Sequence, residues 1–215
     1  MTMPNPAAKS VISDPDEVAA ALATMDLSID VLTDSANAGE QAAVKATAAH
    51  PRTAAGLNRW IETVGTARDH LADRGPWLID DPQNRPLAVH TSGNGLALAF
   101  ASGDSLTGHQ DLKPNVARKK GRATTDSYAQ LTIPFTLPPS NNHAPAARGP
   151  WIFLYYRGEH ELRMEVSLPT MFDQGLVVDW HQRIILPPLT FDVAKPLPRD
   201  AGNTDVEFVL EPRDA

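Results

Sequence analysis

The sequence predicts an α+β protein in which a small N-terminal helical hairpin or bundle packs on a mainly antiparallel β-sandwich or barrel domain. Up to residue 75, apolar residues recur at helical spacing. From residue 76, short alternating apolar runs are separated by Gly and Pro, with no helical pattern between them. We therefore divide the chain into a flexible arm (1–12), a helical subdomain (13–75) and an antiparallel β domain (76–215).

The first predicted helix begins at Asp14, which can cap it, with Pro15 at the first helical position and Glu17 completing a capping box. Its apolar residues follow at alternating spacings of four and three, and this partner-helix seam consists of Val18, Leu22, Met25, Ile29 and Leu32. This spacing predicts one continuous helix that stops at Gly39. The seam can pair with another helix, in this chain or in a partner chain.

Two further helices are predicted, over 40–49 and 53–74, and Gly75-Pro76 ends the second of them. Alanine occupies many of the inward positions of these helices. The bundle alone would be thin, so we expect the second half of the chain or another chain to cover it.

Seven strands are predicted after residue 76, at 87–91, 96–101, 128–137, 151–156, 162–168, 176–186 and 206–210. Gly93-Asn94-Gly95 predicts a hairpin turn between the first two. Strict alternation over 162–168 predicts one dry and one wet face. Two long loops, 102–126 and 138–150, interrupt the strands, and loops of this length are often functional.

The composition excludes several classes of function. The chain has 215 residues, 42% of them hydrophobic, a net charge of −7 and no cysteine. Disulfide scaffolds, thiol nucleophiles and Cys-ligated metals are therefore excluded. We expect no cofactor, no secretory signal, no membrane contact and a cytoplasmic, bacterial setting.

A basic run stands out in this acidic chain, because it holds five of the 19 Lys and Arg residues and no acid: Lys113, Arg118, Lys119, Lys120 and Arg122. The loop before it offers small residues whose N–H groups could surround an anion, namely Ser102, Gly103, Thr107 and Gly108. These nine residues form the predicted anion-binding site. The alternative is a solvated loop whose lysines keep the protein soluble.

A metal or acid–base cluster could use His90, Asp104, His109 and Asp111. Their spacing matches no known metal signature, so we predict no metal site and assign these residues to turn chemistry. Glu161 and Glu165 could form a carboxylate pair, but residues four apart on a strand are about 13 Å apart. That face is therefore expected to be solvated, with cross-strand ion pairs.

The tetrapeptide Gly-Asp-Ser-Leu at 103–106 resembles the short block of the same sequence in one esterase/lipase family. The resemblance covers four residues and implies Ser105 as a nucleophile. The chain lacks the Asp-x-x-His block that such enzymes carry near the C-terminus.

These features favour a non-enzymatic accessory or assembly subunit that binds another macromolecule. The helical part would contact another protein chain, and the basic loop would contact a nucleic-acid backbone or an acidic protein surface. One alternative is a small hydrolase that uses Asp104, Ser105 and His109. The other is a structural assembly protein of a shell, tail or scaffold, in which the arm 1–12 and the loop 138–150 bridge neighbours.

Overall fold

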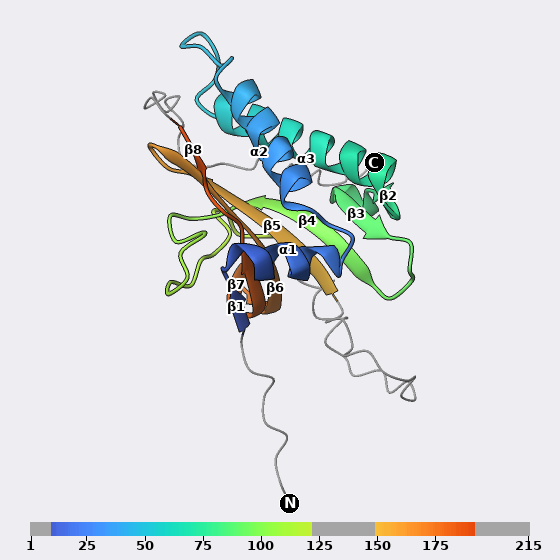
Figure 1. Cartoon of the computed structure of the whole chain (residues 1–215). Coiled ribbons are helices and arrows are strands. Elements are labelled where there is room, and N and C mark those ends of the chain that lie inside the picture. The colour runs from blue at the N-terminus through green and yellow to red at the C-terminus, as the bar shows by residue number, and fades with distance from the viewer. Residues whose placement is uncertain (1–9, 122–148, 192–215) are drawn as a thin grey trace, which may run out of the picture.

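The computed structural model describes residues 10–121 and 149–191 (Figure 1). Its helices are α1 (Pro15–Ala23), α2 (Ile29–Ala43) and α3 (Ala54–Arg74), with a short 3-10 helix η1 (Pro82–Asn84). Its strands are β1 (Ser10–Ile12), β2 (Trp77–Asp80), β3 (Leu87–His90), β4 (Leu96–Ser102), β5 (Gly149–Arg157), β6 (Glu161–Asp173), β7 (Leu176–Ile185) and β8 (Leu189–Thr190).

The eight strands form one mixed sheet in the order β1-β7-β6-β5-β4-β3-β2, with β8 paired to β6. The pairs β4–β5 and β1–β7 are parallel, and the remaining pairs are antiparallel. The sheet is not closed, since β1 and β2 lie at its two ends. The α+β class with N-terminal helices is confirmed, whereas the choice between sandwich and barrel stays a prediction.

The hairpin between β3 and β4 is confirmed, with Gly93 and Gly95 both at positive φ. Three other predicted strands are found as β5, β6 and β7. The short strands β1, β2 and β8 had no alternation long enough to predict them. The predicted strands 128–137 and 206–210, and nearly all of the loop 138–150, lie outside the described residues.

The prediction of one continuous first helix is wrong. The Asp14 cap is confirmed, because its carboxylate accepts hydrogen bonds from the N–H groups of Asp16 and Glu17. However, α1 ends at Ala23, Asp26 adopts φ 53°, and the Ser28 hydroxyl caps α2 by accepting a hydrogen bond from the Val31 N–H. The apolar spacing continued through the break because both helices pack on the same core.

The predicted stop at Gly39 and the predicted helix 40–49 are also wrong, because α2 runs through Gly39 to Ala43. A Cβ on Gly39 would lie 2.1 Å from Thr63 Oγ1 and 2.7 Å from the Arg59 carbonyl oxygen. Glycine here permits close packing of α2 against α3 and does not end the helix. The third predicted helix is confirmed as α3.

One hydrophobic core joins the three helices to the sheet, and Phe153 and Tyr155 of β5 lie in it, fully buried. Figure 1 shows the helices gathered against the strands. The five seam residues all pack in or against this core: Val18, Leu22, Met25 and Leu32 are buried and Ile29 is partly buried. The seam therefore packs within this chain. Residues 10–12 of the predicted arm form β1, parallel to β7.

We predict that Gly39→Ala lowers the free energy of unfolding by about 1–3 kcal/mol, because the new methyl group has no room between α2 and α3. The matched control is Gly65→Ala in α3, where a Cβ meets no atom within 4 Å. That change should raise stability by about 0.5–1 kcal/mol through helix propensity. Urea unfolding of both variants checks this, and equal effects of the two changes would contradict the assigned packing.

Candidate anion-binding site

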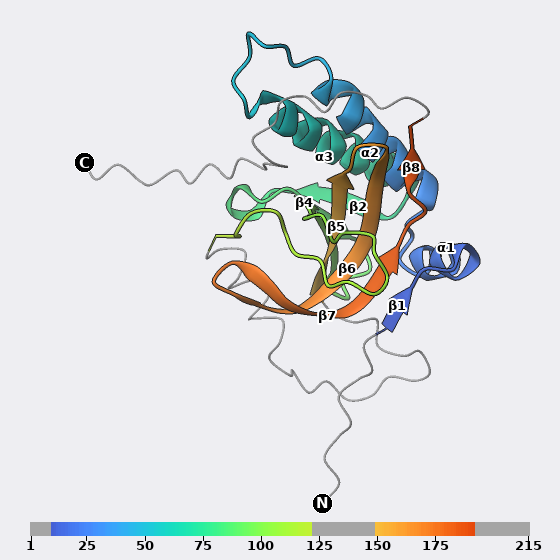
Figure 2. The same ribbon diagram turned by 90° about the vertical axis from the view of Figure 1, so that its left-hand side faces the viewer.

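The segment 103–121 lies across the face of the sheet opposite the main core. Side chains alternate along β5, so Ile152 and Leu154 point away from Phe153 and Tyr155. A second small core forms there from Ala101, Val116, Ile152, Leu154, Val177 and Trp180. The segment is the light green trace beside the strands in Figure 2. It therefore serves as the cover of this face.

Hydrogen bonds fix the backbone of the basic run to β7. The Asn115 side chain bonds both backbone groups of Val177, donating to its carbonyl and accepting from its N–H, each at 2.9 Å. Trp180 Nε1 donates to the Pro114 carbonyl at 2.9 Å. The Lys120 N–H donates to the Gly175 carbonyl at 2.7 Å. The run is therefore held at residues 114–115 and again at Lys120.

A fully buried carboxylate, Glu165 of β6, anchors the loop before the basic run. Arg183 of β7 pairs with it through Nη2 at 2.5 Å and Nε at 3.1 Å. The Gly108 N–H donates to Glu165 Oε2 at 3.0 Å, and the Ser167 hydroxyl donates to Oε1 at 2.8 Å. Four donors thus surround one buried charge, which offsets its desolvation.

Arg183 also binds the loop directly. Its Nη1 donates to the Leu112 carbonyl at 2.6 Å and its Nη2 donates to the His109 carbonyl at 3.1 Å. The expectation that Glu165 lies on a solvated face is therefore wrong. The alternation of β6 was read correctly, but its polar face is covered by a loop distant in sequence.

The small residues of the predicted site bond within the chain. Ser102 is buried and its carbonyl accepts from the Ala117 N–H at 2.9 Å. The Gly103 N–H donates to the Tyr155 carbonyl at 2.8 Å, and the Gly108 N–H is taken by Glu165. Thr107 is fully buried. The backbone N–H groups of Gly103 and Gly108 thus donate to acceptors of the protein itself and do not point at an anion.

The cations are placed differently from one another. Lys119 is exposed, while Arg118 and Lys120 are half-buried. The Lys113 side chain is about half-exposed, and its Nζ lies 3.1 Å from Asp179 Oδ1. A pocket of about 250 Å³ lies beside Lys113, between β1, residues 110–113 and β7. Arg122 lies outside the described residues.

The side chains of the alternative hydrolase bond to other groups. Both oxygens of the Asp104 carboxylate accept backbone N–H groups, from Leu106 and Asn115, each at 3.0 Å. The His109 ring contacts Arg163 Nη1, and Ser105 is exposed. Over the described ranges, no hydrogen bond joins Asp104, Ser105 and His109.

The four residues considered for a metal cluster do not gather around a common point of contact. His90 is bonded to Asp26 and Ser92, not to Asp104 or His109. Among residues 10–121 and 149–191, no group of three or more His, Asp or Glu side chains could hold a metal ion.

A second buried carboxylate was not found by sequence reasoning. Glu40 of α2 accepts from Arg59 Nε of α3 and, at 3.1 Å, from Arg157 Nε of β5. Arg157 also donates to the carbonyls of Gly158 and Glu159 and lies over the Phe191 ring, 4.2 Å from its centroid. In the sequence, the buried position of Glu40 was indicated only by the small residues around it on the inward face of α2. The buried position of Arg183 was indicated in a similar way, because it is a cation inside the apolar run 176–186.

Comparison of the chain with protein-family models, with curated proteins and with solved structures found no match. In the part of the chain that the structure describes, no helix is both long and apolar enough to span a membrane.

We predict that Glu165→Gln destabilises the fold by about 3–5 kcal/mol, because it leaves the buried Arg183 guanidinium without its counter-charge. Urea unfolding measures the loss. The control is the double variant Glu165→Leu with Arg183→Met, which removes both charges and should be clearly more stable than Arg183→Met with Glu165 intact. The single variant Glu165→Leu completes the cycle, and strict additivity of Glu165→Leu and Arg183→Met in the double variant would contradict the pairing.

Proposed function

We propose that this protein is an accessory or assembly subunit that binds an anionic macromolecule through the basic segment 113–122, and that this contact is a non-enzymatic one. The observation that carries this proposal is the hydrogen-bonded backbone of the described part of the segment, residues 113–121. Hydrogen bonds from Trp180, from the Asn115–Val177 pair and from the Lys120 N–H hold it on the sheet, while Lys113 and Lys119 reach solvent.

A fixed loop suits binding better than a mobile one. Ordering a flexible segment costs about 1–2 kcal/mol per residue, and a segment already ordered by intramolecular bonds avoids most of that cost. The loop therefore presents its cations at defined positions before any partner arrives.

The net charge of −7 is compatible with a local anionic contact. Screening limits the reach of each charge to about 8–10 Å at physiological salt, so distant acids weaken the contact little. Four cations lie within eight positions of an ordered segment (Lys113, Arg118, Lys119 and Lys120), and Asp179 is paired with the first of them. This excess of positive charge favours an anionic partner. The partner we propose carries closely spaced negative charge, as a nucleic-acid backbone or an acidic protein surface does.

The helical seam has no part in this contact, because its residues lie in or against the core. We place the binding event in the cytoplasm, on the basis of the cysteine-free composition.

We predict salt-dependent binding of a short fluorescent DNA duplex, measured by anisotropy, with the logarithm of affinity falling by about 0.9 per phosphate contact for each tenfold rise in salt. The combined variant Lys113→Gln, Lys119→Gln should weaken binding at least about tenfold at low salt and reduce that slope.

The matched control neutralises two exposed cations on the turn between α2 and α3, Lys45→Gln with Arg52→Gln, which changes net charge equally. An immobilised acidic polypeptide serves as the second probe. Binding of neither probe, or equal loss in both double variants, would overturn the proposal. Binding of the polypeptide alone would assign the partner as a protein.

A further inference from the structure

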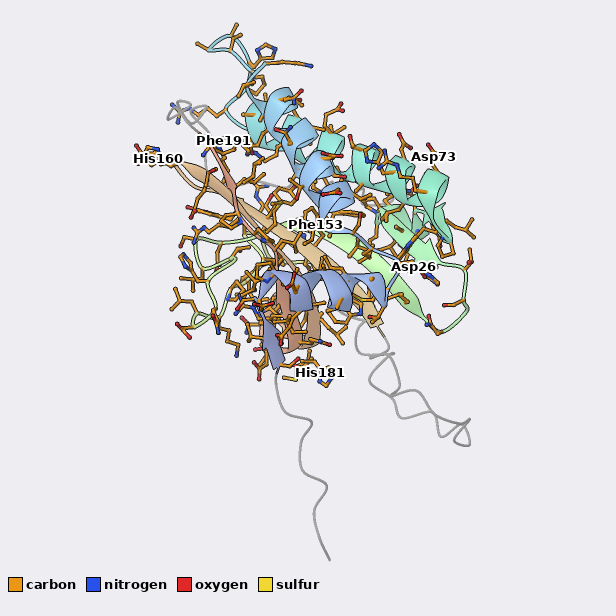
Figure 3. All side chains as sticks on the ribbon, in the orientation of Figure 1. Asp26, Asp73, Phe153, His160, His181 and Phe191 are labelled. Carbon is orange, nitrogen blue, oxygen red and sulfur yellow. The ribbon has the colours of Figure 1, made fainter. Side chains whose placement is uncertain are left out.

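Asp26, His90 and Ser92 form a hydrogen-bonded line of an acid, an imidazole and a hydroxyl, and none of them belongs to the basic segment. Asp26 Oδ2 lies 2.9 Å from His90 Nε2, and Ser92 Oγ lies 2.8 Å from His90 Nδ1. Figure 3 labels Asp26 in the turn between α1 and α2, next to β3 and β4. The three residues come from this turn and from the β3–β4 hairpin.

The hydrogen bonds assign the proton on the ring. The Ser92 backbone N–H donates to His90 Nδ1 at 3.1 Å, so Nδ1 carries the lone pair. In neutral imidazole the other nitrogen, Nε2, then carries the hydrogen, and it faces the Asp26 carboxylate. The Ser92 hydroxyl is consequently the donor to Nδ1. This is the polarity in which a histidine can take a proton from a serine and an aspartate holds the histidine.

Buried structure supports the acid and the base. Trp77 of β2 is almost fully buried, its Nε1 donates to the Asp26 carbonyl at 3.2 Å, and its ring meets the His90 ring edge-on at 5.0 Å. Asp26 is at φ 53° in the turn between α1 and α2, and this conformation brings its carbonyl to Trp77 and its carboxylate to His90.

The hydroxyl end of the line is open. Ser92 is exposed, and a Cβ built on Gly93 or Gly95 would meet no atom within 4 Å. The His90 side chain is largely shielded, whereas Asp26 is about half-exposed. An ester carbonyl can therefore reach Ser92 Oγ from solvent while the imidazole stays fixed behind it.

We propose that Ser92 is a nucleophile for acyl transfer from small activated esters, with His90 as its base and Asp26 as the residue that positions His90. Ser92 Oγ bonds to the ester carbonyl carbon as its proton passes to His90 Nδ1. The C–O bond to the alcohol breaks, and the alcohol leaves with that proton. Water, deprotonated by the same nitrogen, then bonds to the acyl carbon; the C–O bond to Ser92 breaks, the proton on Nδ1 returns to Ser92 Oγ, and the carboxylic acid leaves.

This activity is independent of the anionic contact, because the two sites share no residue. It also differs from the hydrolase considered from the sequence, in which Ser105 is the nucleophile. Ser105 therefore provides an internal control, as a second exposed serine on a loop.

The full-length protein is treated with a fluorophosphonate probe, which phosphonylates activated serines with loss of fluoride, and the modified residue is located by peptide mass spectrometry. We expect modification at Ser92, its loss in Ser92→Ala and its retention in Ser105→Ala. Release of nitrophenol from p-nitrophenyl acetate should fall to the buffer rate in Ser92→Ala, and by about 10²-fold or more in His90→Gln.

The role of Asp26 is tested by measuring which nitrogen of His90 carries the proton. In Asp26→Asn, the ¹⁵N NMR shifts of His90 should show a smaller fraction protonated at Nε2, and modification should slow by about tenfold or more. Thermal unfolding of Ser92→Ala should match the wild type, since this side chain is exposed. An unmodified wild type, or equal modification of wild type and Ser92→Ala, would overturn the proposal whatever the result with DNA.

Discussion

Two buried carboxylates hold the layers of this protein together. Glu165 of β6 lies under the segment 103–121, and Glu40 of α2 lies between the helices and the end of β5. Each is neutralised by arginine from another element, Arg183 in the first case and Arg59 with Arg157 in the second. A buried charge without these partners would cost several kcal/mol, so each pair favours only the arrangement that brings its members together.

The Glu165–Arg183 pair gives the segment 103–121 its shape. Arg183 donates to two backbone carbonyls of the loop, and Glu165 accepts a hydrogen bond from a backbone N–H of the same loop. Both members of the ion pair therefore bind the loop backbone. The basic run that follows continues along β7, where the Asn115 side chain bonds to the Val177 backbone. A loop rich in charge thus becomes an ordered layer over the sheet, and Lys113 and Lys119 on it are exposed to solvent.

The break between α1 and α2 likewise creates polar contacts between distant parts of the chain. A continuous helix would have kept Asp26 on the helix surface. The left-handed turn instead carries its carboxylate to His90 and its carbonyl to Trp77. A departure from helical geometry thereby joins the helical part to the β3–β4 hairpin through polar contacts.

By itself the sequence determined what depends on neighbours in the chain: the Asp14 cap, α3 from its apolar periodicity, the β3–β4 hairpin from its glycines, and the alternating strand that became β6. Only the tertiary structure decided the burial and the contacts of residues whose partners are distant in the sequence. Gly39 looked like a helix stop until α3 was seen against it, and Glu165 looked solvated until a loop more than 50 residues away covered it. Propensity and periodicity act over a few residues, whereas the free energy of burying a charge or closing a helix pair is set by groups that only the folded chain brings into contact.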